Sequence, residues 1–417
     1  MFLIYTISMA KSNKLIYLDY SASVLPNPSS IHLLGVEAKR KLQNARKEIS
    51  AILKCRPEEI IFTSGGTESN NLAIQGVVLA KAFPLPLGKR VAFSKPHIIT
   101  TNIEHPSVLE TFKMLQKRKL AEISIIPVEK NGIVDPKKIK KAIKKNTVLV
   151  SVMYANNEIG TIQPIREIAK EIRHYNKNNR PCLFHTDAVQ AVNYLDLNVE
   201  KLGVDLLSLS GAKIEGAGRV GILYKKKTVS LSPIFGGGDQ EMSLRPGTEN
   251  LPEILKFSKA LKLIEKNKEP ASTRTSLGGK ENKRLTKLRD YFFKKLQKMS
   301  KTGLDKNMSK PVFDTGVIIN GDLQNRLPNN VNITFPKIPS DLLVIELSAK
   351  GIMASSKSAC KSSGKEGSYV IQAINPELDK EIGGVRFSLG KKTTKADIDY
   401  TVKALSQVLQ KLKKWYY

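Results

Sequence analysis

Cysteines, long apolar runs and internal repeats are scarce or absent in this chain of 417 residues. Its only three cysteines are Cys55, Cys182 and Cys360, which excludes a disulfide framework and favours a reducing compartment. No apolar run approaches the roughly 20 residues that span a bilayer, and no repeat period is visible. Apolar residues make up 41% and charged residues 25% of the chain, which excludes a disordered or collagen-like protein. We therefore expect a cytoplasmic globular protein of two or three domains.

Acidic residues are too few to balance the basic ones, and the formal net charge is +30. Such an excess suits an acidic partner such as tRNA. However, 53 of the 68 basic residues are lysine, whereas arginine is preferred for recognition of phosphates and bases. We interpret the charge as solvated helix faces, with tRNA contact as the less favoured alternative. The N-terminus lacks a basic region before its short apolar stretch, so we expect no signal peptide and leave Met1 and Met9 open as the start.

The order of apolar patterns predicts an α/β fold. Strands are expected at 60–63, 97–103, 147–154, 182–185 and 204–209, and helices at 33–53, 68–82, 107–118 and 165–176. This alternation predicts a large domain over 1–265, with its core at about 27–265, built on a mostly parallel central sheet sandwiched by helices.

A shift to Pro, Ser, Thr, Gly and Lys around 269–280 predicts a domain boundary. The following part, 266–417, is expected to form a smaller α+β domain, with helices at 283–299 and 395–414 and strands at 331–335 and 385–389. Its segment 355–368, SSKSACKSSGKEGS, is almost entirely small or charged. We predict that it is a mobile loop carrying Cys360.

Polar side chains follow each of the expected strands in the large domain. The strand at 60–63 runs into Gly66 and Thr67 at the start of a helix, a pattern that can hold a phosphate. The later strand ends carry His105, Asn157, Asp187 with Gln190, and Ser210 with Lys213. Each residue alone has an ordinary interpretation as a cap, a turn residue or a solvated lysine. Because the carboxyl ends of parallel strands meet at one sheet edge, we expect them to form one site.

Together these groups match the needs of pyridoxal phosphate, which requires a lysine for a Schiff base and a carboxylate for the pyridinium nitrogen. His185 and Asp187 also look like a metal pair, but two ligands without a third do not make a zinc site, so no metal is expected.

On these residues the chain resembles the cysteine desulfurases, pyridoxal-phosphate enzymes of the class V aminotransferase group with the aspartate-aminotransferase-like fold (fold type I). The matching stretches run in family order over nearly the whole chain: YLDYSA (17–22), NPSSIH (27–32), IIFTSGGTESNNLAI (60–74), TTNIEHPSVLE (100–110), NNEIGTIQPI (156–165), FHTDAVQA (184–191), VDLLSLSGAK (204–213), LRPGTEN (244–250), SACKSS (358–363) and VRFSLG (385–390).

The resemblance implies a role for each matching residue. Lys213 would form the Schiff base and move protons, His105 would stack on the cofactor ring, and Cys360 would take the substrate sulfur as a persulfide. The remaining cofactor contacts would come from Gly66, Thr67, Asn157, Asp187, Gln190, Ser210 and Thr248. Thr248 would reach the phosphate of the other subunit, which implies a homodimer. Asn157 and Arg386 would bind the L-cysteine substrate, and L-alanine would be released. The sulfur would pass to an acceptor protein of iron–sulfur cluster assembly or to a tRNA-thiolation enzyme.

The chain departs from the family pattern in several places. Ala212 stands where a histidine usually precedes the lysine, and the stretch between YLDYSA and NPSSIH is short by about a helix. Asp239 interrupts the Gly-Gly-Gly-Gln-Glu stretch, and 83–96 and 270–321 are longer than usual. Two alternatives stay open: a selenocysteine lyase, and a degenerate scaffold of the same fold without catalysis.

Overall fold

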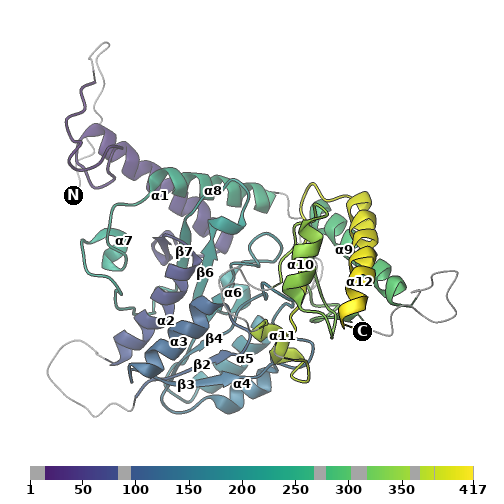
Figure 1. Ribbon diagram of the computed structural model, residues 1–417. Helices are drawn as coiled ribbons and strands as arrows, with labels where there is room; N and C mark the ends of the chain where they lie inside the picture. Colours follow the sequence, from purple (N-terminus) through teal and green to yellow (C-terminus); the bar gives the residue numbers. More distant parts are fainter. Residues whose placement is uncertain are drawn as a thin grey trace.

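The computed structural model describes residues 15–82, 95–266, 279–301, 317–356, 367–379 and 381–416 (Figure 1). Two β-sheets, each with its own helices, make up this part of the chain. None of the described helices is long and apolar enough to cross a membrane.

The larger sheet has seven strands in the order β1-β7-β6-β5-β4-β2-β3. The strands are β1 (Ile60–Thr63), β2 (His97–Thr101), β3 (Glu122–Ile126), β4 (Thr147–Ser151), β5 (Leu183–Asp187), β6 (Leu206–Ser210) and β7 (Gly221–Lys225). The pairs β2–β3, β2–β4, β4–β5 and β5–β6 are parallel, and β7 runs antiparallel to both of its neighbours. The predicted α/β fold with a mostly parallel sheet is therefore confirmed.

Helices cover both faces of this sheet. The helices of this part of the chain are α1 (Leu33–Leu53), α2 (Gly66–Ala82), α3 (Pro106–Lys117), α4 (Pro136–Ala142), α5 (Ile165–Asn176), α6 (Val199–Leu202), α7 (Gln240–Ser243) and α8 (Leu251–Lys266), with short 3-10 helices η1 (Pro57–Glu59) and η2 (Gly211–Lys213). Helices α1 and α8 pack side by side (Figure 1).

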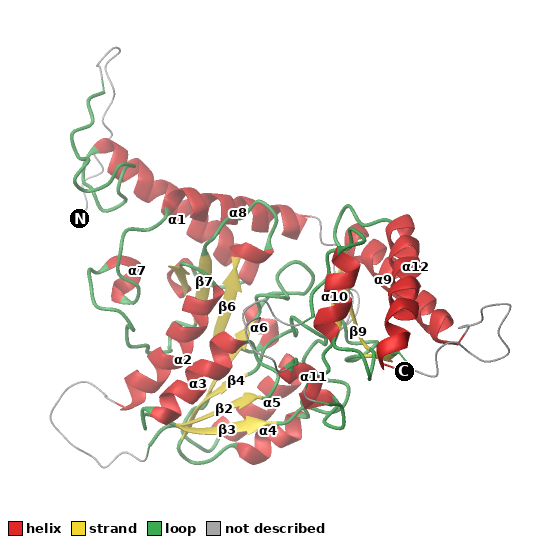
Figure 2. Ribbon diagram, in the orientation of Figure 1, coloured by secondary structure: helices red, strands yellow, loops and turns green. Residues whose placement is uncertain are grey.

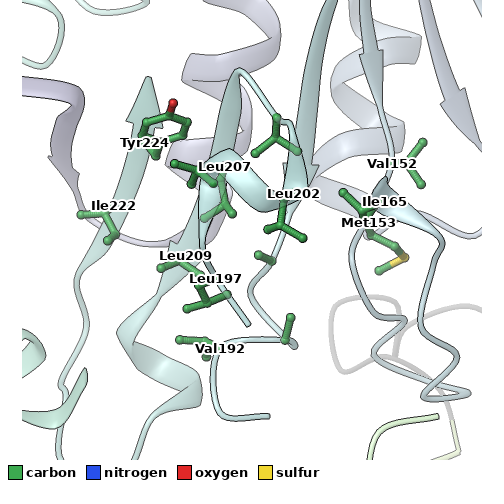
Figure 3. Close-up of a cluster of buried hydrophobic side chains, with 14 of the residues drawn as sticks. Val152, Met153, Ile165, Val192, Leu197, Leu202, Leu207, Leu209, Ile222 and Tyr224 are labelled. Carbon is green, nitrogen blue, oxygen red and sulfur yellow. The ribbon is translucent and has the colours of Figure 1, made fainter. Parts of the chain in front are cut away.

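Side chains of the larger sheet pack into two separate cores, one on each face. Ile60 and Phe62 of β1 belong to one core, whereas Ile61 between them belongs to the core on the other face. Figure 3 shows part of the first core, where Leu207 and Leu209 of β6 lie with Ile222 and other apolar side chains. Because both faces are covered, nearly every residue of the central strands is buried, as is typical of parallel sheets.

The smaller sheet is antiparallel, with strands β8 (Ile318–Ile319), β9 (Asn330–Thr334) and β10 (Val385–Ser388) in the order β10-β9-β8. Its helices are α9 (Lys280–Lys301), α10 (Ser340–Ser348) and α12 (Lys395–Tyr416). The short helix α11 (Tyr369–Ile374) instead packs into the core of the larger sheet through Val370, Ile371 and Ile374. Helices α9, α10 and α12 form a group beside the larger sheet (Figure 2). A third apolar core, which includes Phe292 of α9, Ile333 of β9 and Leu405 of α12, holds this part together. The division at residues 265 and 266 stays a prediction.

Candidate functional site

The carboxyl ends of the central strands border a cavity of about 460 Å³. Nine of the eleven site residues predicted from the sequence line it: Gly66, Thr67, His105, Asn157, Asp187, Gln190, Ser210, Lys213 and Arg386. Eight come from the ends of β-strands in the larger sheet or from the turns and helices that follow them, and Arg386 comes from β10 of the smaller sheet. The cavity is therefore shared by residues of both sheets.

Gly66 begins α2, a helix of 17 residues, directly after the turn that follows β1. A Cβ atom at Gly66 would lie 2.8 Å from Val189 Cγ2 and 3.3 Å from Ser210 Cβ, so no larger residue fits there without a shift. The bare backbone therefore lies open to the cavity at a helix N-terminus, beside the hydroxyl groups of Thr67 and Ser210. Such an arrangement of donors suits an anionic group such as a phosphate.

Asp187 is the last residue of β5, and only 5% of it is exposed. Its Oδ1 accepts a hydrogen bond from Val189 N at 3.0 Å, and its Oδ2 accepts one from Asn70 Nδ2 at 2.8 Å. Both oxygens are thus fixed by donors at the cavity wall. A carboxylate held in this way can pair with a cationic ring nitrogen.

His105 precedes α3 and caps its N-terminus, because its Nδ1 accepts a hydrogen bond from Ser107 N at 3.1 Å. Burial lowers the pKa of His105, Asp187 acts in the opposite sense, and Lys213 lowers it further. The imidazole is therefore held toward its neutral form in a cavity that also contains an amine and a carboxylate.

Arg386 connects the two sheets at the cavity. Its Nη1 donates to the Asn157 carbonyl oxygen at 3.0 Å, and burial lowers the pKa of the guanidinium, an effect that Glu158 partly offsets. The amide oxygen Oδ1 of Asn157 is buried and has no hydrogen-bond partner among the described residues. A guanidinium and an unused amide oxygen at one wall suit a substrate that carries a carboxylate and a donor group.

Several cavity residues were missed by the sequence analysis, namely Asn70, Ser107, Met153, Val189, Asn193, Tyr194, Asn329 and Ser388. Asn70 lies one helical turn after Gly66, so helical spacing from the glycine turn was a usable signal for it. Ser107 looked like an ordinary residue of a helix first turn. Asn329 precedes β9. It reaches the cavity through the pairing of β9 with β10 and through the hydrogen bond of Asn330 Nδ2 to the Glu158 carbonyl oxygen at 2.9 Å.

Two predicted residues remain, Thr248 and Cys360. Thr248 is exposed and does not line it. The chain before Thr248 is tied down by two ion pairs, Glu241 with Arg46 and Arg245 with Glu68. Cys360, with the segment 357–366, lies outside the described residues.

The other two cysteines are poor nucleophiles. Burial raises the pKa values of Cys55 and Cys182 to about 12, and neither residue lines the cavity. A thiol is reactive only as the thiolate, so both side chains are inert near neutral pH.

Neither Ala212 nor His185 lines the cavity. Ala212 is exposed and does not line the cavity, so no side chain from this position contributes a donor. His185 is fully buried in β5, where Nδ1 lies 2.8 Å from Ser151 Oγ and Nε2 lies 3.0 Å from Ser208 Oγ. Burial lowers its pKa to about 3, so His185 serves the core and not the cavity.

Comparisons with known proteins agree on one family. The profile described as aminotransferase class-V matches residues 9–401. A protein named "Cysteine desulfurase IscS" from Dictyoglomus turgidum is 39% identical over 95% of both chains. One of the same name from Methanosarcina thermophila is 39% identical over 97% of this chain and 95% of its own.

Solved structures show the same likeness. A structure titled "NifS-like protein" is 34% identical, with a TM-score of 0.76 over 93% of this chain and 92% of that one. A NifS-like protein from Rickettsia africae is 27% identical, with a TM-score of 0.73 over 92% of both chains.

Proposed function

The chain belongs to the aminotransferase class-V family, and from that premise we propose that it is a cysteine desulfurase. It converts L-cysteine to L-alanine and captures the sulfur as a persulfide on Cys360. In the overall reaction the Cβ–Sγ bond of the substrate breaks, Cβ gains a proton, and the sulfur joins the Cys360 thiol. The observation that carries this function is the cavity that unites Lys213, Asp187, His105 and Arg386.

The cavity fits pyridoxal phosphate, the cofactor on which this family depends. The Gly66 backbone, Thr67 and Ser210 would hold the phosphate, Asp187 the ring nitrogen, and Lys213 the carbonyl carbon through a Schiff base. Gln190 and Asn157 would lie on the side of the ring hydroxyl. When bound, the cofactor supplies an electron sink that stabilises negative charge on the substrate carbon next to the amine.

Three side chains would act on the substrate itself. Arg386 would bind the carboxylate, since its guanidinium offers a planar pair of donors and is already oriented by the Asn157 carbonyl. Lys213 and His105 would move the protons, because an amine and a mostly neutral imidazole lie in the same cavity.

Cys360 is the only cysteine of the chain left for the sulfur once Cys55 and Cys182 are set aside, because their thiol pKa values are raised and neither lines the cavity. Its segment is attached close to the cavity: Ser355 exchanges two backbone hydrogen bonds with Arg386, at 3.1 and 2.7 Å. In the sequence Cys360 follows Ser355 by five residues, and an extended chain of that length spans at most roughly 18 Å.

The far end of the segment is also attached near the site. The Tyr369 hydroxyl donates to the carbonyl oxygen of Glu104, the residue before His105, at 2.5 Å. Ser368 Oγ donates to the Glu158 carboxylate. One end of the cysteine-bearing segment is therefore bonded to Arg386 itself. The other end is bonded to Glu104 and Glu158, the sequence neighbours of His105 and Asn157.

A homodimer is part of the proposal, with Thr248 reaching the phosphate in the site of a second subunit. Thr248 is exposed outside its own cavity, and the first part of the described chain exposes large apolar side chains, among them Ile31 at 96% and Leu18 at 88%. Apolar surface of this kind is typical of an interface. The sulfur would then pass to an iron–sulfur scaffold protein or to a tRNA-thiolation enzyme.

The test is to incubate the cofactor-loaded protein with L-cysteine and to measure alanine together with protein-bound persulfide. Cys360→Ser should form no persulfide, whereas Cys55→Ser, the matched control, should behave as the wild type. Persulfide that persists on Cys360→Ser would contradict the assignment. Parallel assays with selenocysteine identify a selenocysteine lyase if that substrate alone is turned over, and no product from either substrate identifies a non-catalytic scaffold.

A further inference from the structure

A chain of short hydrogen bonds links the Asp187 carboxylate to the His105 ring through two residues that the proposed chemistry does not use. Asn70 Nδ2 lies 2.8 Å from Asp187 Oδ2 and 2.8 Å from Ser107 Oγ. Ser107 Oγ in turn lies 2.8 Å from His105 Nδ1. All four residues line the same cavity, and they come from α2, α3, β5 and the residue that caps α3.

The direction of each hydrogen bond follows from the donor inventory of the groups. A carboxylate only accepts, so the Asn70 atom beside Asp187 is the amide nitrogen, and its second hydrogen is directed to Ser107 Oγ. The Ser107 hydroxyl hydrogen is then available for His105 Nδ1. The backbone N–H of Ser107 also donates to this Nδ1, at 3.1 Å. Two donors thus converge on one ring nitrogen, which must be the unprotonated one.

We propose that Ser107 is a positioning residue whose hydroxyl, oriented by Asn70, donates to His105 Nδ1 and holds the imidazole as the neutral tautomer with its proton on Nε2. This inference rests on the proposed function, because it matters for the reaction only if His105 handles protons over a cofactor held by Asp187. Ser107 and Asn70 need not touch substrate or cofactor, and they act through His105 and Asp187.

Burial stabilises the hydrogen bonds that link Asn70, Ser107 and His105. Asn70 is 1% exposed and Ser107 is 9% exposed, so water does not compete for their hydrogen bonds. Protonation of Nδ1 would set its N–H against the backbone N–H of Ser107, which cannot turn away. The charged groups that line the cavity with His105 are Asp187 from β5, Lys213 from η2 and Arg386 from β10. Burial and Lys213 lower the pKa of His105 and Asp187 raises it, which agrees with a neutral ring.

Nitrogen-15 NMR of the histidine rings reads the tautomer without any turnover. The full chain, loaded with cofactor, is labelled at its five histidines, and His105→Gln assigns the signal of interest. In the wild type, His105 should show the proton on Nε2. In Ser107→Ala one hydrogen bond to the neutral ring is lost, so the pKa of His105 should rise by about half a unit to one unit. Ser107→Thr keeps the hydroxyl and should restore the wild-type value.

Thr111→Val is the matched control, because Thr111 also carries a buried hydroxyl between α3 and α2, which lies 2.8 Å from the Ser107 carbonyl oxygen and 2.9 Å from Asn71 Oδ1. It should leave the titration of His105 unchanged. A wild-type ring with its proton on Nδ1 would overturn the proposal even if no variant folds. An unchanged pKa in Ser107→Ala would also overturn it. Loss of desulfurase activity alone would not overturn this proposal, because the tautomer is measured without substrate. Such a loss would contradict only the proposed function.

Discussion

Replacing Glu104 by glutamine should prevent the loss of folding stability that ionisation of this buried carboxyl causes as the pH rises. The Glu104 side chain is fully buried next to His105, and its Oε1 accepts hydrogen bonds from Thr101 Oγ1 at 2.7 Å and from Met153 N at 2.9 Å. Its Oε2 has no hydrogen-bond partner among the described residues. Burial, with a smaller contribution from Asp187, raises the pKa of Glu104 to about 8, although the two hydrogen bonds act in the opposite sense. The carboxyl is therefore mostly protonated at pH 7.

The sign of the effect follows from the raised pKa. The folded state binds this proton more tightly than the unfolded state, so the stabilisation is complete below pH 4.5 and is lost as the pH rises to about 8. A rise from 4.5 to about 8 corresponds to about 5 kcal/mol in the free energy of unfolding, at 1.36 kcal/mol per pKa unit. Glutamine keeps the shape and stays neutral, so the variant should gain stability relative to the wild type by about 1.4 kcal/mol per pH unit across this window.

Two assays check this prediction. Infrared difference spectra of wild type against Glu104→Gln at pH 7 should show the carbonyl band of one protonated carboxylic acid, which fades above pH 8. In thermal unfolding, the stability of the variant relative to that of the wild type should be greater at pH 9 than at pH 6. Glu110→Gln, which removes a charge at a half-exposed ion pair of α3, is the control and should show neither effect. A missing band, or a stability difference that is the same at both pH values, would refute the reasoning.

Three further predictions follow from the cavity and its surroundings. Arg386→Gln should raise the KM for L-cysteine by roughly 10- to 150-fold with a smaller change in kcat, and an unchanged KM would show that the carboxylate binds elsewhere. Glu241→Ala leaves the buried Arg46 without its partner and should lower the free energy of unfolding by about 3–5 kcal/mol in denaturant titrations, whereas a loss below 1 kcal/mol would contradict the anchoring role. Ala212→His should tighten pyridoxal-phosphate binding by roughly 5- to 150-fold in titrations of the cofactor-free protein. Equal or weaker binding would show that a histidine at this position does not contribute to cofactor affinity.

Much of the larger sheet could be predicted from the sequence, because its central strands are short apolar runs between amphipathic helices. Helices α1 and α5 have the expected bounds of 33–53 and 165–176. Strand β3 was missed, since it lies at the sheet edge and its side chains are half-exposed rather than uniformly apolar. Strand β7 was missed as well, because a single antiparallel strand breaks the alternation of strand and helix on which the prediction relied.

The cavity could be predicted where chemistry follows a strand end, because the topology alone brings such residues to one edge. Asn70 and Ser107 cannot be predicted from strand ends, because they join the site through hydrogen bonds between α2, α3 and β5. Asn329 cannot be found in this way either, because it reaches the cavity through the pairing of β9 with β10 and the hydrogen bond of Asn330 to Glu158. The role of Thr248 needs a second chain, and Cys360 lies outside the described residues, so both remain predictions.

The most direct test of the account is the visible absorption spectrum of the purified protein before and after addition of L-cysteine, for the wild type and for Lys213→Ala. Lys391→Ala, which removes an exposed amine paired with Glu215, is the control. The account predicts a cofactor band in the wild type and in the control that changes on addition of cysteine, and no such band or change in Lys213→Ala. A protein that takes up no cofactor, or a Lys213→Ala variant whose spectrum and response equal those of the wild type, would contradict the account.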